Sequence, residues 1–299
     1  MERKYISRNG VVERTRYAVG DNAAPRGKRK KGNTGFRKQE ANFNGAVRQA
    51  ARIMNCNFSA SGGYWCTLSY DQGGLRKLME KAGVAEREYL ELVEAGCGAP
   101  EAPADGGEAD AEERLDEEAA AMLDRVDAAA EHALRLWLRR VKRKLGCTVK
   151  AFGVTAEIDG KTGEITRIHH HISVQITAEH DRLEAMAALQ AAWSAGQADI
   201  RTLREMPDYT PTAVYMLRQV RRREHEQKYF ATRGMERPEI SEREILGNNE
   251  IKAPPGANVL ERAEYDGEHI AQYVRYIPKK REKREGHKRE IQEMPIDPA

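Results

Sequence analysis

The chain has 299 residues, a formal net charge of only +3 and an apolar fraction of 40%. This length allows one large or two modest domains, but the apolar fraction is low for a globular protein, so we expect part of the chain to lie outside any core. No apolar run approaches the roughly 20 residues that span a bilayer, and the N-terminus lacks a signal-peptide core, which predicts a cytoplasmic protein without membrane contact. The four cysteines have no CxxC spacing, which excludes a zinc ribbon or a disulfide framework.

Positive charge is concentrated at the N-terminal end of the chain. Residues 1–53 hold 14 Lys or Arg against 4 Asp or Glu, and the run "RGKRKKGNTGFRK" lies within them. Such a run is typical of an arm that binds phosphate groups, which makes Lys30 and Lys31 candidate phosphate contacts. We therefore expect residues 1–36 to form a basic flexible arm. A solvated tail without a ligand is the alternative.

Apolar periodicity predicts alternating helices and strands after this arm. Apolar positions at helical spacing over 43–54 predict an amphipathic helix, and the run "YWCTLSY" at 64–70 predicts a buried strand. A second helix is expected over 74–92. The Gly-, Pro- and acid-rich stretch 96–118 has almost nothing to bury and is expected to be a linker or insertion. It leads into a long helix over about 115–145, whose acidic start and basic end complement the helix dipole.

The second half of the chain begins with a predicted β-hairpin. Two alternating stretches surround the turn "DGKTGE" within residues 147–177. Helices are expected over 181–193 and 210–224, with a short strand over 197–205 between them. Residues 241–299 contain the loop "GNNEIKAPPGANV" and end in a basic tail. The order of these elements indicates an α+β protein.

Three consecutive histidines lie in the second strand of the hairpin, within "RIHHHISVQI". Alternate residues of a strand share a face, so Ile168, His170 and Ile172 are expected on the core side. His169 and His171 then project together from the polar face, where two imidazoles are well placed to share a divalent metal. Polar-face packing with no metal is the alternative.

A carboxylate on the neighbouring strand completes the predicted metal site. If the hairpin turn is centred near Thr162, the residues that face the two histidines are Thr155 and Gly153. Glu157 then lies on the same face, one pleat away, and is the expected third ligand.

Three segments occur in a particular order: the strand "YWCTLSYD", the His-x-His strand and the helix segment "YMLR". In this order they resemble the motifs of HUH endonucleases, specifically the rolling-circle replication initiator (Rep) proteins of plasmids and phages, including the filamentous-phage replication endonuclease group. The matching residues are Thr67 to Tyr70, His169, His171, Tyr215 and Arg218. Flanking segments such as "RLWLRRVKRKLG" and "YFATRGMERPEI" also resemble that group, so the similarity covers residues 36–240 approximately.

The resemblance implies an HUH, ferredoxin-like architecture. We expect an antiparallel sheet of about five strands with helices on one face and the site on the open face. The endonuclease domain would span residues 37–240, with 96–118 as an acidic insertion. Residues 241–299 would form a C-terminal extension with a basic tail.

The resemblance also assigns the chemistry. Tyr215 would attack the DNA and form a covalent 5′-phosphotyrosine. His169, His171 and Glu157 would hold Mg²⁺ or Mn²⁺, and imidazole ligands favour Mn²⁺. Two departures from the family pattern stand out. The middle residue of the His motif is itself a histidine, and Arg218 replaces the usual lysine, which limits its role to electrostatics.

The implied substrate is origin DNA, engaged as a single strand or an extruded hairpin. Arg221, Arg222 and Arg223 would contact its phosphates, together with Lys30 and Lys31 of the arm. No GxxxxGK[ST] loop occurs in the chain, so a host helicase and other host replication proteins would unwind and copy the DNA. The protein would then act in the cytoplasm of a bacterial cell that carries the plasmid or phage.

The sequence also allows other interpretations. Tyr276, in "YIPK", is the second-choice nucleophile. A relaxase or a single-tyrosine transposase of the same superfamily is an alternative, but relaxases carry the tyrosine ahead of the histidines. Because Arg218 replaces the usual lysine, a further alternative is a relative that binds DNA without cutting it. A cupin-like metal enzyme is a remote alternative, because Gln175 stands where a cupin has glutamate and the chain is too helical for a small barrel.

Overall fold

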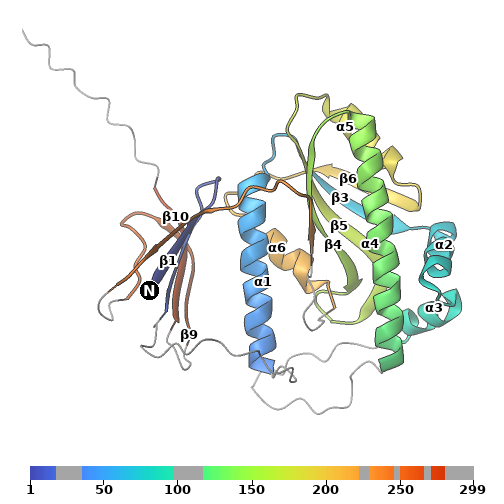
Figure 1. Ribbon diagram of the computed structural model, residues 1–299, viewed down its shortest axis with the longest axis horizontal. Helices are drawn as coiled ribbons and strands as arrows, with labels where there is room; N and C mark the ends of the chain where they lie inside the picture. Colours follow the sequence, from blue (N-terminus) through green and yellow to red (C-terminus); the bar gives the residue numbers. More distant parts are fainter. Residues whose placement is uncertain (18–35, 97–116, 222–228, 246–249, 266–270, 280–299) are drawn as a thin grey trace, which may run out of the picture.

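The computed structural model describes residues 1–17, 36–96, 117–221, 229–245, 250–265 and 271–279. Within these ranges the protein is α+β, with two antiparallel five-stranded sheets and six helices (Figure 1). In this part of the chain no helix is both long and apolar enough to cross a membrane.

The first sheet, which we call the main sheet, has the strand order β6-β3-β5-β4-β7. Its strands are β3 (Gly63–Tyr70), β4 (Val149–Ile158), β5 (Ile165–Ile176), β6 (Gly196–Thr202) and β7 (Phe230–Ala231). The predicted strand at 64–70 and the predicted hairpin are thereby confirmed. The central position of β5, between β3 and β4, places the three histidines in the middle of the sheet.

Four helices cover one face of the main sheet, which we call the helix-covered face. They are α2 (Gln72–Ala82), α3 (Glu86–Glu94), α4 (Glu117–Leu145) and α5 (Arg182–Ala192). Their buried side chains form one core with Leu68, Ile172 and Val174 of the sheet. The single helix expected over 74–92 is divided in two, because Gly83 ends α2 in the left-handed conformation, at φ 65°.

The opposite face is partly covered by α1 (Phe36–Asn57) and α6 (Thr210–Arg218). The expectation of helices on one face only is therefore wrong. The physical reason lies in β4, where Phe152 and Val154 project to this second face and need apolar partners. The buried stripe of α1 and residues such as Met216 of α6 supply them. The helix expected over 210–224 is shorter than predicted and ends at Arg218.

A second sheet joins the two ends of the chain, with the strand order β8-β1-β2-β10-β9. Its strands are β1 (Glu2–Ile6), β2 (Val12–Tyr17), β8 (Glu239–Arg243), β9 (Asn258–Tyr265) and β10 (Ala271–Ile277). The prediction of a flexible arm is therefore wrong for residues 1–17, because β1 and β2 pair with strands more than 200 residues away. The rest of that arm, 18–35, and the insertion at 97–116 lie outside the described residues.

The second sheet docks on α1, which stands between the two sheets (Figure 1). At the contact, the carboxylate of Glu13 is only 2% exposed. Arg52 of α1 donates to it at 2.7 Å, and the hydroxyl of Tyr273 donates to the same oxygen at 3.1 Å. The guanidinium of Arg52 also stacks over the ring of Tyr5 at 3.5 Å from its centroid. The negative charge of Glu13 can be buried because the guanidinium of Arg52 and the hydroxyl of Tyr273 both donate hydrogen bonds to it.

We expect Arg52→Leu to lower the free energy of unfolding by about 3 kcal/mol or more, because it leaves the carboxylate of Glu13 buried without its charged partner. The measurement is equilibrium unfolding in urea. Arg135→Leu is the matched control, since the pair of Arg135 with Glu131 is 73% and 40% exposed and should contribute less than about 0.5 kcal/mol. Equal effects of the two substitutions would contradict this account of the docking.

Candidate active site

The pleat of β5 separates the three histidines as predicted. His170 is fully buried on the helix-covered face, with Nε2 2.9 Å from the hydroxyl of Tyr70 and Nδ1 3.3 Å from that of Thr155. Burial lowers the pKa of His170 to about 3, so this imidazole is neutral. His169 and His171 project together from the opposite face.

The two outer histidines aim their Nε2 atoms at one point. These atoms lie 3.1 Å apart, and the side-chain oxygen of Gln219 lies 3.2 Å from Nε2 of His171. Gln219 caps the C-terminal end of α6 and is 7% exposed. Three polar atoms from a strand and a helix end therefore converge.

Hydrogen bonds on the far side of His169 and Gln219 turn acceptor atoms toward this point. Nδ1 of His169 lies 2.9 Å from the carbonyl of Arg167, which can only accept, so Nδ1 carries a proton and the lone pair of the neutral ring is on Nε2. The amide nitrogen of Gln219 donates to the carbonyl of Tyr215 at 3.1 Å, which turns the amide oxygen toward the histidines. Burial lowers the pKa of His171 to about 4, so this imidazole is neutral. Its Nε2 donates to the amide oxygen of Gln219 in this structure and presents a lone pair in the other tautomer.

Such a set of lone pairs fits a divalent cation. Ligands about 2.1 Å from a metal and about 90° apart lie about 3 Å from one another, which agrees with the observed separations of 3.1 and 3.2 Å. Two imidazoles and one amide oxygen suit Mn²⁺ better than Mg²⁺, which prefers an all-oxygen shell. The partners that orient His169 and Gln219 act as the outer shell that such ligands normally have.

Glu157 is not the third member of this set. Among the described residues, no group of three or more His, Cys, Asp or Glu is placed to hold a metal. The hairpin pairs Val154 and Ala156 with His171 and His169, one residue away from the expected register. A shift of one residue exchanges the faces of a strand. Beyond a bulge that follows Ala156, Glu157 lies 3.8 Å from Arg221.

The bulge nevertheless contributes to the site through its backbone. The N–H groups of Glu157 and Ile158 both donate to the carbonyl of Gln219, at 2.9 and 3.2 Å. Gly160 in the hairpin turn lies so close that a Cβ there would be 3.3 Å from Cγ of Gln219. Gln219 is thus the residue that sequence reasoning missed as a ligand. Its signal was its position four residues after Tyr215, on the same face of the helix.

Tyr215 projects from α6 beside the histidine pair. Its hydroxyl lies 3.4 Å from Nε2 of His171, and the two rings are in contact with centroids 5.3 Å apart. The side chain is unusual for a tyrosine at a helix–sheet junction, because 52% of the residue is exposed. Arg218, the last residue of α6, is also exposed. The structure therefore places an exposed tyrosine at the edge of the cluster formed by Nε2 of His169, Nε2 of His171 and the amide oxygen of Gln219, which we call the acceptor cluster.

Two other candidate residues are placed in the interior. Tyr276 belongs to β10 of the second sheet, is 3% exposed and packs with Val12 and Val274. Burial raises the pKa of its phenol, so it is not an accessible nucleophile. Arg221 is 8% exposed and forms ion pairs with Asp124 and Glu157, which removes it from the predicted DNA contacts. The remaining predicted contacts lie outside the described residues: Lys30, Lys31, Arg222 and Arg223.

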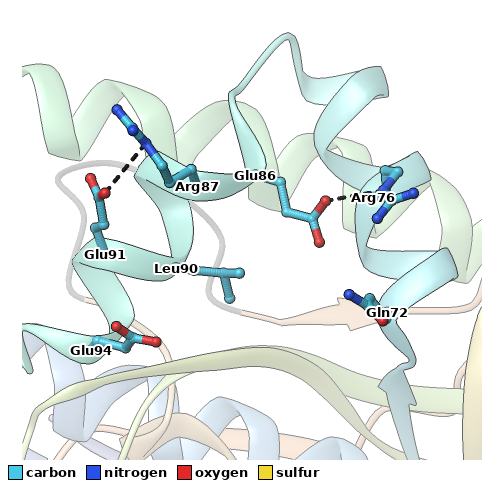
Figure 2. Close-up of a pocket in the computed structure, with 7 residues that line it drawn as sticks. All are labelled: Gln72, Arg76, Glu86, Arg87, Leu90, Glu91 and Glu94. Carbon is cyan, nitrogen blue, oxygen red and sulfur yellow. Dashed lines mark hydrogen bonds and ion pairs between the residues drawn. The ribbon is translucent and has the colours of Figure 1, made fainter.

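A groove is lined by residues of α2 and α3 (Figure 2). These helices cover the face of the main sheet opposite the one from which the histidine pair projects. The charged side chains of the groove compensate one another, because Arg76 pairs with Glu86 at 3.2 Å and Arg87 pairs with Glu91 at 3.3 Å. The groove has no converging set of acceptors like that of the histidine pair. We therefore take the histidine pair as the candidate site.

The site combines a cation-binding set of acceptors with an accessible phenol, and three separate segments build it. Thr67 of β3 contributes as well, since its hydroxyl lies 3.3 Å from Nδ1 of His171. No protein-family model, curated protein or solved structure matches the chain.

We expect Gln219→Ala to weaken Mn²⁺ binding by about tenfold or more, because it removes one of three converging ligand atoms. Gln219→Glu should retain binding, since its carboxylate supplies an oxygen in the same place. Isothermal titration with Mn²⁺ measures both. Glu157→Gln is the control and should bind Mn²⁺ as the wild type does, whereas a loss confined to Glu157→Gln would restore the carboxylate as the ligand.

Proposed function

We propose that this protein is an HUH-type rolling-circle replication initiator, which nicks and rejoins single-stranded origin DNA through a covalent 5′-phosphotyrosine. The observation that carries the proposal is the exposed hydroxyl of Tyr215, 3.4 Å from Nε2 of His171 and beside the acceptor cluster. A phenol suits such a reaction because phosphotyrosine stores the bond energy and is later displaced.

The spatial arrangement supports the proposal independently of the sequence motifs. The three segments that resemble Rep motifs are separated by about 100 and 40 residues along the chain. The hydroxyl of Thr67 nevertheless lies 3.3 Å from Nδ1 of His171, and the hydroxyl of Tyr215 lies 3.4 Å from Nε2 of the same ring. The order of these segments, with the tyrosine after the histidines, favours an initiator over a relaxase.

The residues of the chain divide the reaction between them. The hydroxyl oxygen of Tyr215 attacks phosphorus and forms a P–O bond while the bond from phosphorus to the 3′ oxygen breaks. The phenol proton passes to water, which reaches this half-exposed side chain, and the 3′ oxygen takes up a proton. His169, His171 and Gln219 would hold the divalent cation. The chemistry supplied by such a cation is polarisation of the phosphate and stabilisation of the leaving 3′ oxygen.

Arg218 follows Tyr215 by three residues on α6 and stays charged at every accessible pH. It therefore serves as an electrostatic partner for the phosphate and not as a proton acceptor. The substitution of arginine for lysine also favours a second candidate, a relative that binds DNA without cutting it. The substrate we propose is a single strand or hairpin, because the phosphate must be accessible, with duplex opening left to a host helicase and host replication proteins.

We expect the wild type to form a covalent adduct with single-stranded origin DNA in the presence of Mn²⁺, and Tyr215→Phe to form none. A denaturing gel that retains only covalent protein–DNA complexes makes the measurement. Tyr276→Phe is the matched control, since Tyr276 is buried in the second sheet and its loss should leave adduct formation unchanged. An adduct from Tyr215→Phe would refute the nucleophile. The absence of an adduct from wild type would favour the binding-only relative.

We expect the three histidines to differ in their effect on nicking. His169→Ala or His171→Ala should abolish it, because each removes a converging Nε2 atom. His170→Leu should leave the nicking rate largely intact while lowering the free energy of unfolding by about 1–3 kcal/mol, because Tyr70 and Thr155 lose their buried partner. Nicking assays and urea unfolding on the same samples separate the two effects. Loss of nicking in a folded His170→Leu protein would contradict the division of roles.

A further inference from the structure

We infer that the half of the main sheet formed by β3 and β6 holds the DNA strand next to the cleaved phosphate, with a base stacked on Trp65. This inference rests on the proposed function. It adds a contact with the bases of the DNA to the proposed contacts with the cleaved phosphate. The ligand class is single-stranded DNA recognised through its bases, with little dependence on their sequence.

On the face that carries the histidine pair, this half of the sheet is open at β6, whereas Trp65 of β3 also packs against the margin of the apolar cluster beneath α1 and α6. The apolar cluster beneath α1 and α6 contains Phe152 and Val154 of β4, and no residue of β6. On β6, Gln197, Asp199 and Arg201 are exposed and alternate with Ile200, which faces the opposite core. We call the strip formed by Trp65, Gln197, Asp199 and Arg201 the β3–β6 face.

Trp65 lies at the junction of the β3–β6 face and the acceptor cluster. Its ring stacks on that of His171, with centroids 5.3 Å apart and planes 29° apart. It also contacts the ring of Tyr215 at 6.0 Å. A base stacked on this indole would therefore lie beside both the proposed nucleophile and a proposed metal ligand.

The other two tryptophans of the chain have no such access. Trp137 is fully buried and its indole N–H donates to the carbonyl of Leu189 at 3.0 Å. Trp193 is 6% exposed and donates to the carbonyl of Ser69 at 2.9 Å. Trp65 is partly exposed: it packs against the margin of the apolar cluster beneath α1 and α6, and across the strand pair it faces the exposed Arg201 of β6. Both structural tryptophans are covered by the fold, and only Trp65 can meet a ligand from solution.

The charges of the β3–β6 face favour base contacts over phosphate contacts. Arg201 and Asp199 form an ion pair at 2.7 Å, which leaves this strip without net charge. A neutral surface gains little from the phosphate backbone. Stacking on an aromatic ring works with any base, because every base has a π-face. The DNA contact at this face is therefore a stacking contact.

The test uses full-length Tyr215→Phe protein, in which binding is measured without bond cleavage. The probes are a thymidine oligonucleotide of about 16 nucleotides and an abasic strand of the same length and charge. The thymidine strand should quench the intrinsic fluorescence of the protein, and the abasic strand should not. Adding Trp65→Phe should remove the quenching, because the remaining tryptophans are buried.

Affinity measurements on the same strands separate stacking from a structural role. Trp65→Ala should weaken binding of the thymidine strand by roughly 5- to 150-fold while changing the affinity of the abasic strand little. Leu183→Ala is the control, since Leu183 is 76% exposed on α5, on the other side of the sheet, and should change neither affinity.

The inference would be overturned if Trp65→Ala lowered the affinity for both strands equally, or if the thymidine strand did not quench the fluorescence of the protein. Neither result depends on cleavage. The covalent adduct of the wild type tests the proposed function separately, so the failure of one leaves the other measurable.

Discussion

The pleat of β5 is the constraint on which the site depends. Because side chains alternate along a strand, burial of Ile172 and Val174 in the core forces His171 to the opposite face. The same alternation assigns His170 to the interior, where Tyr70 and Thr155 satisfy both its nitrogens. A shift of one residue would bury His169 and His171 and expose the apolar set, so the hydrophobic core itself holds the histidines in position.

The end of α6 is held in register with this strand by backbone contacts. The bulge in β4 presents two adjacent N–H groups to the carbonyl of Gln219, and Gly160 allows the hairpin turn to approach the same residue. Bulges often re-aim side chains next to functional sites. Here the bulge fixes a helix end instead, and through it both Gln219 and Tyr215 reach His171.

The second sheet stabilises the opposite end of α6. Asp208 is buried and accepts hydrogen bonds from Asn55 of α1 and from the hydroxyl of Thr210, the first residue of α6. Arg275 of β10 lies 3.6 Å from the same carboxyl group. β10 and α1 therefore contribute to the site indirectly, because both contact the residue that anchors the start of the helix that carries Tyr215.

The sequence by itself predicted β3, the β4–β5 hairpin, β6 and the long helix α4, together with the division of the three histidines, because these follow from the local periodicity of side chains. It also singled out Tyr215, through the order of the motifs. Only the tertiary structure decided that Gln219, and not Glu157, lies beside the two histidines, since a changed strand register and a bulge alter which face a residue occupies. The pairing of β2 with β10, which turns the predicted arm into a sheet, was likewise a tertiary result. Contacts between residues so distant in the chain depend on packing, and no local pattern encodes them.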